Sequence, residues 1–142
     1  MSSLKPRARA LIDLWLVSER LSARLDHSLG AVHGLGYVEF MVLYQLHRAP
    51  DRKLRRIDLA SAIGRTASGV TRLLRPMEKT GLVARDSSER DARVSLVKIT
   101  ASGEARLSEA QATMNDLGQR LTRGIGDSQL DSVATALATL RD

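Results

Sequence analysis

The stretch from Asp58 to Lys79 constrains the fold of this chain more than any other. Its sequence, DLASAIGRTASGVTRLLRPMEK, places Ala60, Gly64 and Val70 four and six residues apart. Two short helices that cross closely need a small residue in the first helix, a turn residue that tolerates positive φ, and an apolar residue where the second helix packs back. This spacing therefore predicts a helix-turn-helix.

The second helix of this unit is expected over residues 67–79, with Thr66 as its N-cap. One face is apolar at helical spacing and should be buried: Val70, Leu73, Leu74 and Met77. The opposite face is polar and basic: Ser68, Arg72, Arg75 and Lys79. Hydroxyls near a helix start and arginines further along suit the major groove of DNA, and the helix N-terminus favours a phosphate. The first helix is expected over 56–63.

The positive charge of the chain is concentrated in this region. Residues 51–100 contain twelve Lys or Arg and six Asp or Glu, a surplus equal to the net charge of +6 of the whole chain. Residues 1–50 contain six basic and four acidic residues, and residues 101–142 contain four and six. A basic centre between nearly neutral flanks indicates a polyanion-binding module between helices with another role.

The flanks read as helices. Leucines at heptad spacing predict a helix over 5–29 that ends at Gly30. A second helix is expected over 37–48, with Gly36 as N-cap and Glu39 completing a capping box.

Beyond the central unit, residues 82–84 and 94–99 predict a β-hairpin with a charged tip. Helices follow over 101–123, capped by Thr100, and from Asp127 onward, capped by Asp127 itself. Leucine-rich stripes on these helices are typical of a coiled-coil interface.

At this point the chain resembles the MarR family of winged-helix transcription regulators. The segments that carry the resemblance are Leu59-Ala60, Gly64, Val70-Thr71-Arg72, Glu78 to Val83, Asp91-Ala92-Arg93 and Ile99 to Gly103. The resemblance implies a mainly α fold, a winged helix-turn-helix of about six helices with a β-hairpin wing. It also implies a homodimer that binds double-stranded DNA, and a small-molecule effector site between the DNA-binding lobe and the dimerisation helices.

We therefore expect one domain over 1–142. Residues 35–100 would form the DNA-binding lobe, and 1–34 and 101–142 the dimerisation helices. The expected DNA-binding residues are Arg65, Thr66, Ser68, Thr71, Arg72, Arg75, Arg90 and Arg93, with Asp91 as a brace for the wing. The expected effector-binding residues are Trp15, Met41 and Tyr44, for which core packing is an equal alternative. The expected dimer-interface residues are Leu11, Leu107, Met114, Leu117, Leu121, Leu130, Val133 and Leu137.

Four residues depart from the usual family pattern. Arg55 stands where a Ser or Thr usually caps the third helix, and Arg65 replaces an apolar residue. Gly69 lowers helix propensity by about 1 kcal/mol relative to alanine. Pro76 should kink or loosen the recognition helix, because it removes the hydrogen bond to the carbonyl of Arg72.

Other classes have less support in the sequence. No nucleophile–base pair indicates an enzyme, no cofactor motif is present, and His27, His33 and His47 do not pair at metal-ligand spacing. The chain contains no cysteine and no apolar run of the ~20 residues that cross a membrane, so a cytoplasmic protein is expected. Two alternatives to a ligand-responsive repressor stay open, namely a non-specific architectural DNA-binding protein and a protein-interaction module that has lost DNA binding.

Overall fold

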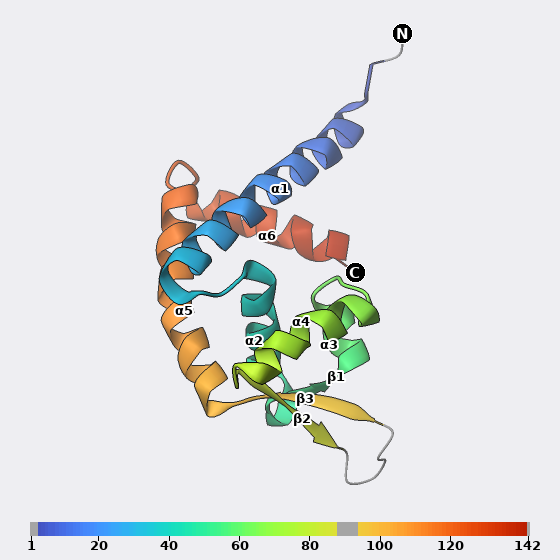
Figure 1. Cartoon of the computed structure of the whole chain (residues 1–142). Coiled ribbons are helices and arrows are strands. Elements are labelled where there is room, and N and C mark those ends of the chain that lie inside the picture. Colours follow the sequence, from blue (N-terminus) through green and yellow to red (C-terminus); the bar gives the residue numbers. More distant parts are fainter. Residues whose placement is uncertain (1–2, 88–93, 142) are drawn as a thin grey trace.

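The chain folds into six α-helices and one small antiparallel sheet, counted over residues 3–87 and 94–141, which the computed structural model describes (Figure 1). The helices are α1 (Pro6–His33), α2 (Tyr37–Arg48), α3 (Arg56–Ala62), α4 (Ala67–Lys79), α5 (Ala101–Leu121) and α6 (Asp127–Arg141). The strands are β1 (Lys53–Arg55), β2 (Val83–Ser87) and β3 (Ser95–Ile99), and a 3-10 turn, η1 (Pro50–Arg52), precedes β1. The predicted fold class, a mainly α winged helix-turn-helix, is confirmed.

The sheet has the order β1-β3-β2, with β3 in the middle and both neighbours antiparallel to it. Val97 pairs with Leu54 of β1 on one side and with Arg85 of β2 on the other. The alternation in β3 did not show which face is inside; the structure buries Val97 and Ile99. The predicted hairpin corresponds to β2 and β3, and β2 extends three residues further than expected.

The core lies between the sheet and α2, α3, α4 and the first half of α5. Its fully buried side chains include Leu43, Leu46, Leu59, Val70, Leu74, Met77, Val97 and Leu107. The apolar face predicted for α4 is therefore correct, with Leu73 only half-buried. Burying that face turns the opposite, basic face of α4 outward.

Gly30 does not end the first helix, and that prediction was wrong. The helix α1 continues to His33 and ends at Gly34, which has φ +60°. The amide of Gly34 donates to the carbonyl of Gly30, and the amide of Leu35 donates to that of Leu29. Leu29 and Leu35 are both fully buried, so the apolar contact across the turn selects Gly34 as the stop.

One predicted capping box and one predicted helix cap were also wrong. Gly36 is the N-cap of α2 as expected, but Glu39 does not complete a capping box with its amide. The carboxylate of Asp26 instead accepts from the next amide, Tyr37 N, at 2.6 Å. Asp127 is the first residue of α6 rather than its cap, and Gln129 accepts from the amide of Gly126 at 3.0 Å. Thr66 and Thr100 cap α4 and α5 as predicted.

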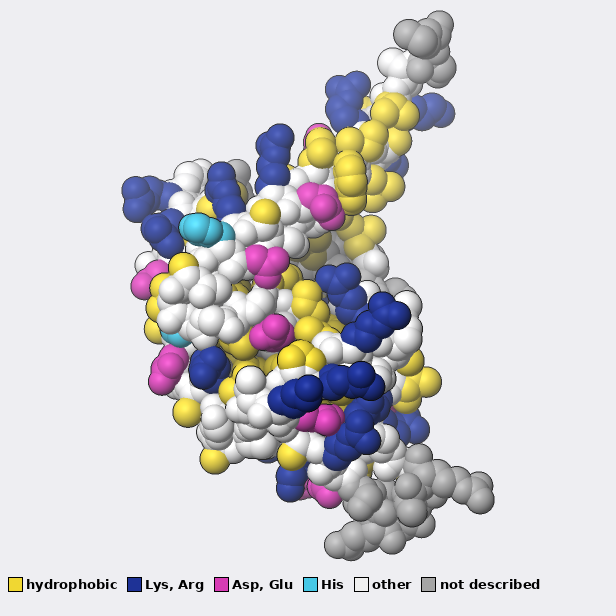
Figure 2. Space-filling model, in the orientation of Figure 1, with side chains coloured by type: hydrophobic (Ala, Val, Ile, Leu, Met, Phe, Trp, Pro, Cys, Tyr) yellow, Lys and Arg dark blue, Asp and Glu magenta, His cyan; other side chains and the backbone are white. Residues whose placement is uncertain are grey.

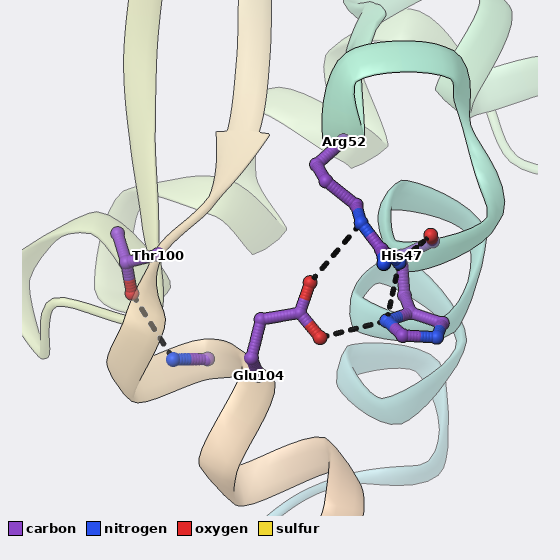
Figure 3. Close-up of polar contacts among 5 residues, drawn as sticks. His47, Arg52, Thr100 and Glu104 are labelled. Atoms are coloured by element: carbon purple, nitrogen blue, oxygen red, sulfur yellow. Dashed lines mark hydrogen bonds and ion pairs between the residues drawn. The ribbon is translucent and has the colours of Figure 1, made fainter.

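A polar cluster ties α2 and η1 to the start of α5 (Figure 3). Glu104 Oε2 lies 2.7 Å from His47 Nδ1, and Glu104 Oε1 lies 3.7 Å from Arg52 Nε. Arg52 also donates to the carbonyl of His47, and Arg52 and Asp51 both have positive φ. In the same view, Thr100 Oγ1 accepts from the amide of Gly103 at 3.0 Å. These contacts set the angle at which α5 leaves the sheet.

The N-terminal half of α1 and all of α6 expose apolar side chains. In Figure 1 the first turns of α1 project beyond the other helices, and Figure 2 shows a yellow surface along this arm. The large exposed residues here are Leu4, Leu11, Ile12, Leu14, Trp15, Leu16, Val17, Leu21, Val133, Leu137 and Leu140. Such a surface marks an interaction site.

Two residues expected at a dimer interface, Leu107 and Leu117, are only 1% and 6% exposed within the single chain. The stripe on α5 thus faces the chain's own core rather than a partner over this part, because α5 packs against both α1 and α2. Met114, Leu121 and Leu130 are half-buried. The described helices include none long and apolar enough to cross a membrane.

Candidate nucleic-acid interface

The exposed face of α4 carries the basic side chains that the sequence placed there. Arg65, Ser68, Arg72 and Arg75 are all exposed, as is Lys79 at the end of the helix. Dark-blue side chains gather over α4 in Figure 2. Within residues 3–87 and 94–141, no acidic side chain forms an ion pair with these arginines or with Lys79. Their charge is therefore directed to solvent and is available to a polyanion.

The start of α4 adds a second attraction for an anion. Thr66 Oγ1 accepts from the amide of Gly69 at 3.1 Å, and the first turn contains no acidic residue. The first amides of a helix have no acceptor within the helix, and they give its N-terminal end a partial positive charge. A phosphate is the natural ligand of such a terminus when arginines surround it.

The close packing of the cap explains Gly69, one of the departures from the family pattern. A Cβ at this position would lie 3.0 Å from Thr66 Oγ1, which is tighter than most real contacts. Glycine at position 69 has a low helix propensity, but it leaves room for the cap hydrogen bond of Thr66. Arg55 occupies the N-cap position of α3 without a side-chain cap hydrogen bond, and its guanidinium pairs with Asp58 at 2.6 Å. The hydrogen bond to Asp58 and its charge raise the pKa of Arg55.

Pro76 does not interrupt α4, which continues through it to Lys79. Thr80 closes the last turn, because its amide and its hydroxyl each donate to the carbonyl of Pro76 at 3.0 Å. The expected loosening is therefore limited to one missing bond at the carbonyl of Arg72.

A polar network behind α4 was not predicted from the sequence. The guanidinium of Arg56 in α3 donates to Thr71 Oγ1 at 3.2 Å and to Glu78 Oε1 at 3.3 Å. Glu78 also pairs with Arg85 of β2 at 3.4 Å. Arg56 thereby joins both helices of the helix-turn-helix to the wing. These residues are far apart in the sequence and follow no period, so only the tertiary structure shows the network.

Replacing Arg56 with leucine is expected to lower the free energy of unfolding by about 1–3 kcal/mol, because Thr71 and Glu78 lose a half-buried donor. Urea denaturation followed by circular dichroism measures this change. Arg65→Leu is the matched control, since Arg65 is exposed and should alter stability by less than about 0.5 kcal/mol. Equal losses in the two variants would contradict a structural role for Arg56.

The network also includes Thr71, which was expected to contact DNA. Its side chain is half-buried, donates to the carbonyl of Ala67 at 3.1 Å and accepts from Arg56. We therefore place it in the contact between α3 and α4. At the base of the wing, Lys53 of β1 pairs with Asp86 of β2 at 3.5 Å. The predicted wing residues Arg90, Asp91 and Arg93 lie outside the described residues.

The three residues expected to bind an effector do not lie together in the structure. Met41 and Tyr44 line a pocket of about 510 Å³ between α2 and α5, together with Phe40, Gln111, Met114 and Asn115. Tyr44 stacks on Phe40 with ring centroids 6.2 Å apart, and Arg48 lies 5.4 Å from the centre of the Tyr44 ring. Trp15 is not part of this pocket and is 60% exposed on the projecting arm of α1. The described residues contain no cluster of three His, Asp or Glu side chains that would hold a metal ion.

Comparison with known proteins shows which family this arrangement resembles. Residues 35–95, from the start of α2 to the start of β3, match the sequence model of the MarR family. Residues 35–95 are therefore similar in sequence to a MarR-family domain. The matched part contains the helix-turn-helix and the wing, while α1, α5 and α6 lie outside it.

Solved structures extend the likeness to nearly the whole chain. Sco3205, a MarR-family transcriptional regulator from Streptomyces coelicolor in complex with DNA, superposes with a TM-score of 0.86 at 21% identity over 97% of this chain and 91% of that one. The regulator MosR of M. tuberculosis in complex with DNA gives 0.77 at 26% identity, over 93% and 92%. NadR in complex with 4-hydroxyphenylacetate gives 0.83 at 22% identity, over 100% and 99%. The MarR-like fold therefore includes the flanking helices.

Proposed function

We propose that this chain is a transcription regulator that binds DNA with α4 in the major groove. The observation that carries the proposal is the outward basic face of α4, whose arginines have no described acidic partner, next to a capped and open helix N-terminus. The structures of Sco3205 and MosR with DNA support it, because their fold is the same. The wing arginine Arg93 would enter the minor groove, where the potential is most negative.

The proposed regulator acts as a homodimer, and its role is binding without catalysis. Residues 35–100 form the DNA-binding lobe, while 1–34 and 101–142 supply the dimer contacts. Support comes from the exposed apolar surface on α1 and α6, including Leu11, Val133 and Leu137, which the single chain leaves uncovered. Two-fold symmetry would place two copies of α4 on half-sites about 10 bp apart in a pseudo-palindrome.

We further propose that a small molecule controls this binding, with repression as the direction. The pocket lined by Met41 and Tyr44 lies between α2, which belongs to the lobe, and α5, which leads to the dimer helices. NadR in complex with 4-hydroxyphenylacetate supports a ligand-responsive protein of this fold. A ligand that re-spaces the two copies of α4 would lower DNA affinity, and by linkage DNA would lower the ligand's affinity equally.

Selection of binding sites from random duplexes tests the proposal. Enrichment of a two-fold sequence, bound at least ~1000-fold more tightly than random DNA at physiological salt, is the expected result. Binding without sequence preference would instead identify an architectural protein. Undetectable binding at low salt would identify a protein-interaction module.

Arg72→Ala is expected to weaken binding to the selected duplex by about 1–3 kcal/mol and to relax base preference at one position of each half-site, because the exposed guanidinium faces away from the core. Titration of the selected and of single-base variant duplexes measures both effects. An equal loss on every duplex would show that Arg72 contacts phosphate only. Arg120→Ala, exposed on α5, is the control and should bind as the unmodified chain does.

A further inference from the structure

A second cavity, of about 280 Å³, lies behind the recognition helix α4. It forms where α1 ends, α2 begins, α4 ends and α5 begins, and its lining consists of Gly34, Glu39, Pro76, Met77, Thr80, Leu82 and Arg106. None of these residues lines the pocket between α2 and α5. The cavity is therefore a separate site, in contact with the last turn of α4.

Two opposite charges line this cavity without pairing. The carboxylate of Glu39 lies beside Gly36 at the start of α2 and forms no ion pair or hydrogen bond with any residue of 3–87 or 94–141, and the residue is half-buried. Arg106 is also half-buried and uses Nη1 to donate to the carbonyl of His33 at 2.9 Å. Its remaining N–H groups have no partner in the part of the chain that the structure describes. Half-buried charges that do not pair with each other fit a ligand that carries both complementary charges.

The end of α4 adds to this polarity. Met77 belongs to its last turn and Thr80 is its C-cap, at the end of the helix that carries partial negative charge. This end of the helix therefore reinforces Glu39 in attracting a cationic group. Arg106 provides the only positive side chain of the described lining, so an anionic group would bind there. Met77, Leu82 and Pro76 supply the apolar part of the lining.

We propose that this cavity binds a small zwitterion, in the form of a free amino acid. Its carboxylate would accept from Arg106, its ammonium group would donate to Glu39, and its side chain would lie against Met77 and Leu82. A volume of about 280 Å³ offers room for an amino acid.

The position of the site gives Pro76 a role, and this step rests on the proposed DNA-binding function. Pro76 has no amide hydrogen, so the last turn of α4 donates no backbone bond from this position to the carbonyl of Arg72. A ligand that touches Pro76, Met77 and Thr80 would favour one orientation of that turn. Arg72 and Arg75 lie in the preceding turn and would follow, so occupancy would change DNA affinity.

Calorimetric titration of the full chain with individual L-amino acids at millimolar concentration, without DNA, tests the site. Saturable binding of at least one of them is expected. Its N-acetyl derivative, which has no ammonium group, and its amide, which has no carboxylate, should each bind at least about ten-fold more weakly. Absence of binding across the panel would overturn the proposal, as would equal binding of the N-acetyl derivative.

Variants locate the binding. Glu39→Gln should bind the amino acid about ten-fold more weakly than the unmodified chain does. It should bind the N-acetyl derivative as tightly as the unmodified chain does, since Glu39 supplies only the ammonium contact. Arg106→Gln should abolish binding. Because Arg106 also holds the end of α1, Glu39→Gln carries the test if the other variant unfolds. Glu109→Gln, exposed on α5 with Arg106, makes the same change outside the cavity and should bind normally. Unchanged affinity and selectivity in Glu39→Gln would place the ligand elsewhere.

Measurement of DNA affinity with and without the amino acid separates the two proposals. A change in affinity that Glu39→Gln removes supports control of α4 through this cavity. Ligand binding with unchanged DNA affinity would overturn the regulatory step and leave the site itself intact. Failure of DNA binding would count against the proposed function alone, because the titration does not involve DNA.

Discussion

Gly103→Ala is expected to destabilise the chain by about 3 kcal/mol or more, the largest loss we expect from a single methyl group here. A Cβ at this position would lie 2.2 Å from the carbonyl oxygen of Leu82 and 2.8 Å from Cγ1 of Ile99. The Leu82 carbonyl cannot move freely, since it accepts from the amide and the hydroxyl of Thr100, each at 3.1 Å. Relief of the overlap would therefore pull α5 off the sheet. Urea denaturation measures the loss.

Gly118→Ala is the matched control for this substitution. Gly118 lies on the same helix, and a Cβ there would have no neighbour within 4 Å. Alanine at an open helical position should raise the free energy of unfolding by about 0.5–1 kcal/mol. The two substitutions thus add the same group to the same helix with opposite expected signs. A Gly103→Ala chain as stable as the unmodified one would show that α5 and β2 separate at little cost.

Leu137→Glu is expected to convert the proposed dimer into monomers. Leu137 is 43% exposed on α6, on the same face as Val133 and Leu140. Burial of a leucine contributes about 1.5–3 kcal/mol, and a two-fold interface contains each change twice. The dissociation constant should therefore rise at least about hundred-fold, since each 1.4 kcal/mol is a factor of ten. Sedimentation velocity over a concentration series measures it.

Thr135→Glu provides the comparison on the opposite face of α6, two residues from both Val133 and Leu137. It adds the same charge to an exposed position of the same helix and should leave the dimer intact. Equal sedimentation of the Leu137→Glu chain and the unmodified chain would remove α6 from the interface. Loss of the dimer in both variants would show that charge on α6, rather than the apolar face, is what matters.

Much of the fold could be predicted because its signals are local. Thr66 and Thr100 act as caps through hydroxyls that reach an amide three residues on, which the sequence displays directly. The spacing of Val70, Leu74 and Met77 shows which face of α4 is inside, and it thereby predicts the outward arginines as well. Helix boundaries in this region agree with the structure to within one residue.

The wrong predictions concern helix ends, caps and burial that depend on residues far apart in the sequence. Gly30 and Gly34 are equally suited to end a helix in isolation, and only the burial of Leu35 beside Leu29 distinguishes them. Asp26, eleven residues before the amide that it caps, has no local signature. Leu107 belongs to a heptad stripe that suits a partner helix, yet it is buried against its own chain.

The candidate site shows the same division. The arginines on the outer face of α4 follow from periodicity, whereas the network of Arg56, Thr71 and Glu78 depends on how α3 and β2 approach that helix. The cavity between Glu39 and Arg106 requires α2 and α5 to converge from positions far apart in the sequence. Neither could be derived before the tertiary structure was known.

The order of the strands has a consequence for how the protein is made. The middle strand, β3, is the last of the three along the chain, and the outer strands pair with it alone. A chain synthesised from its N-terminus therefore completes α2, α3, α4 and both outer strands before the strand that joins them exists. Until Val97 and Ile99 have emerged from the ribosome, β1 and β2 are unpaired edges beside uncovered apolar helices. Closure of the lobe is thus a single late event, and a nascent chain stalled before residue 99 should require a chaperone.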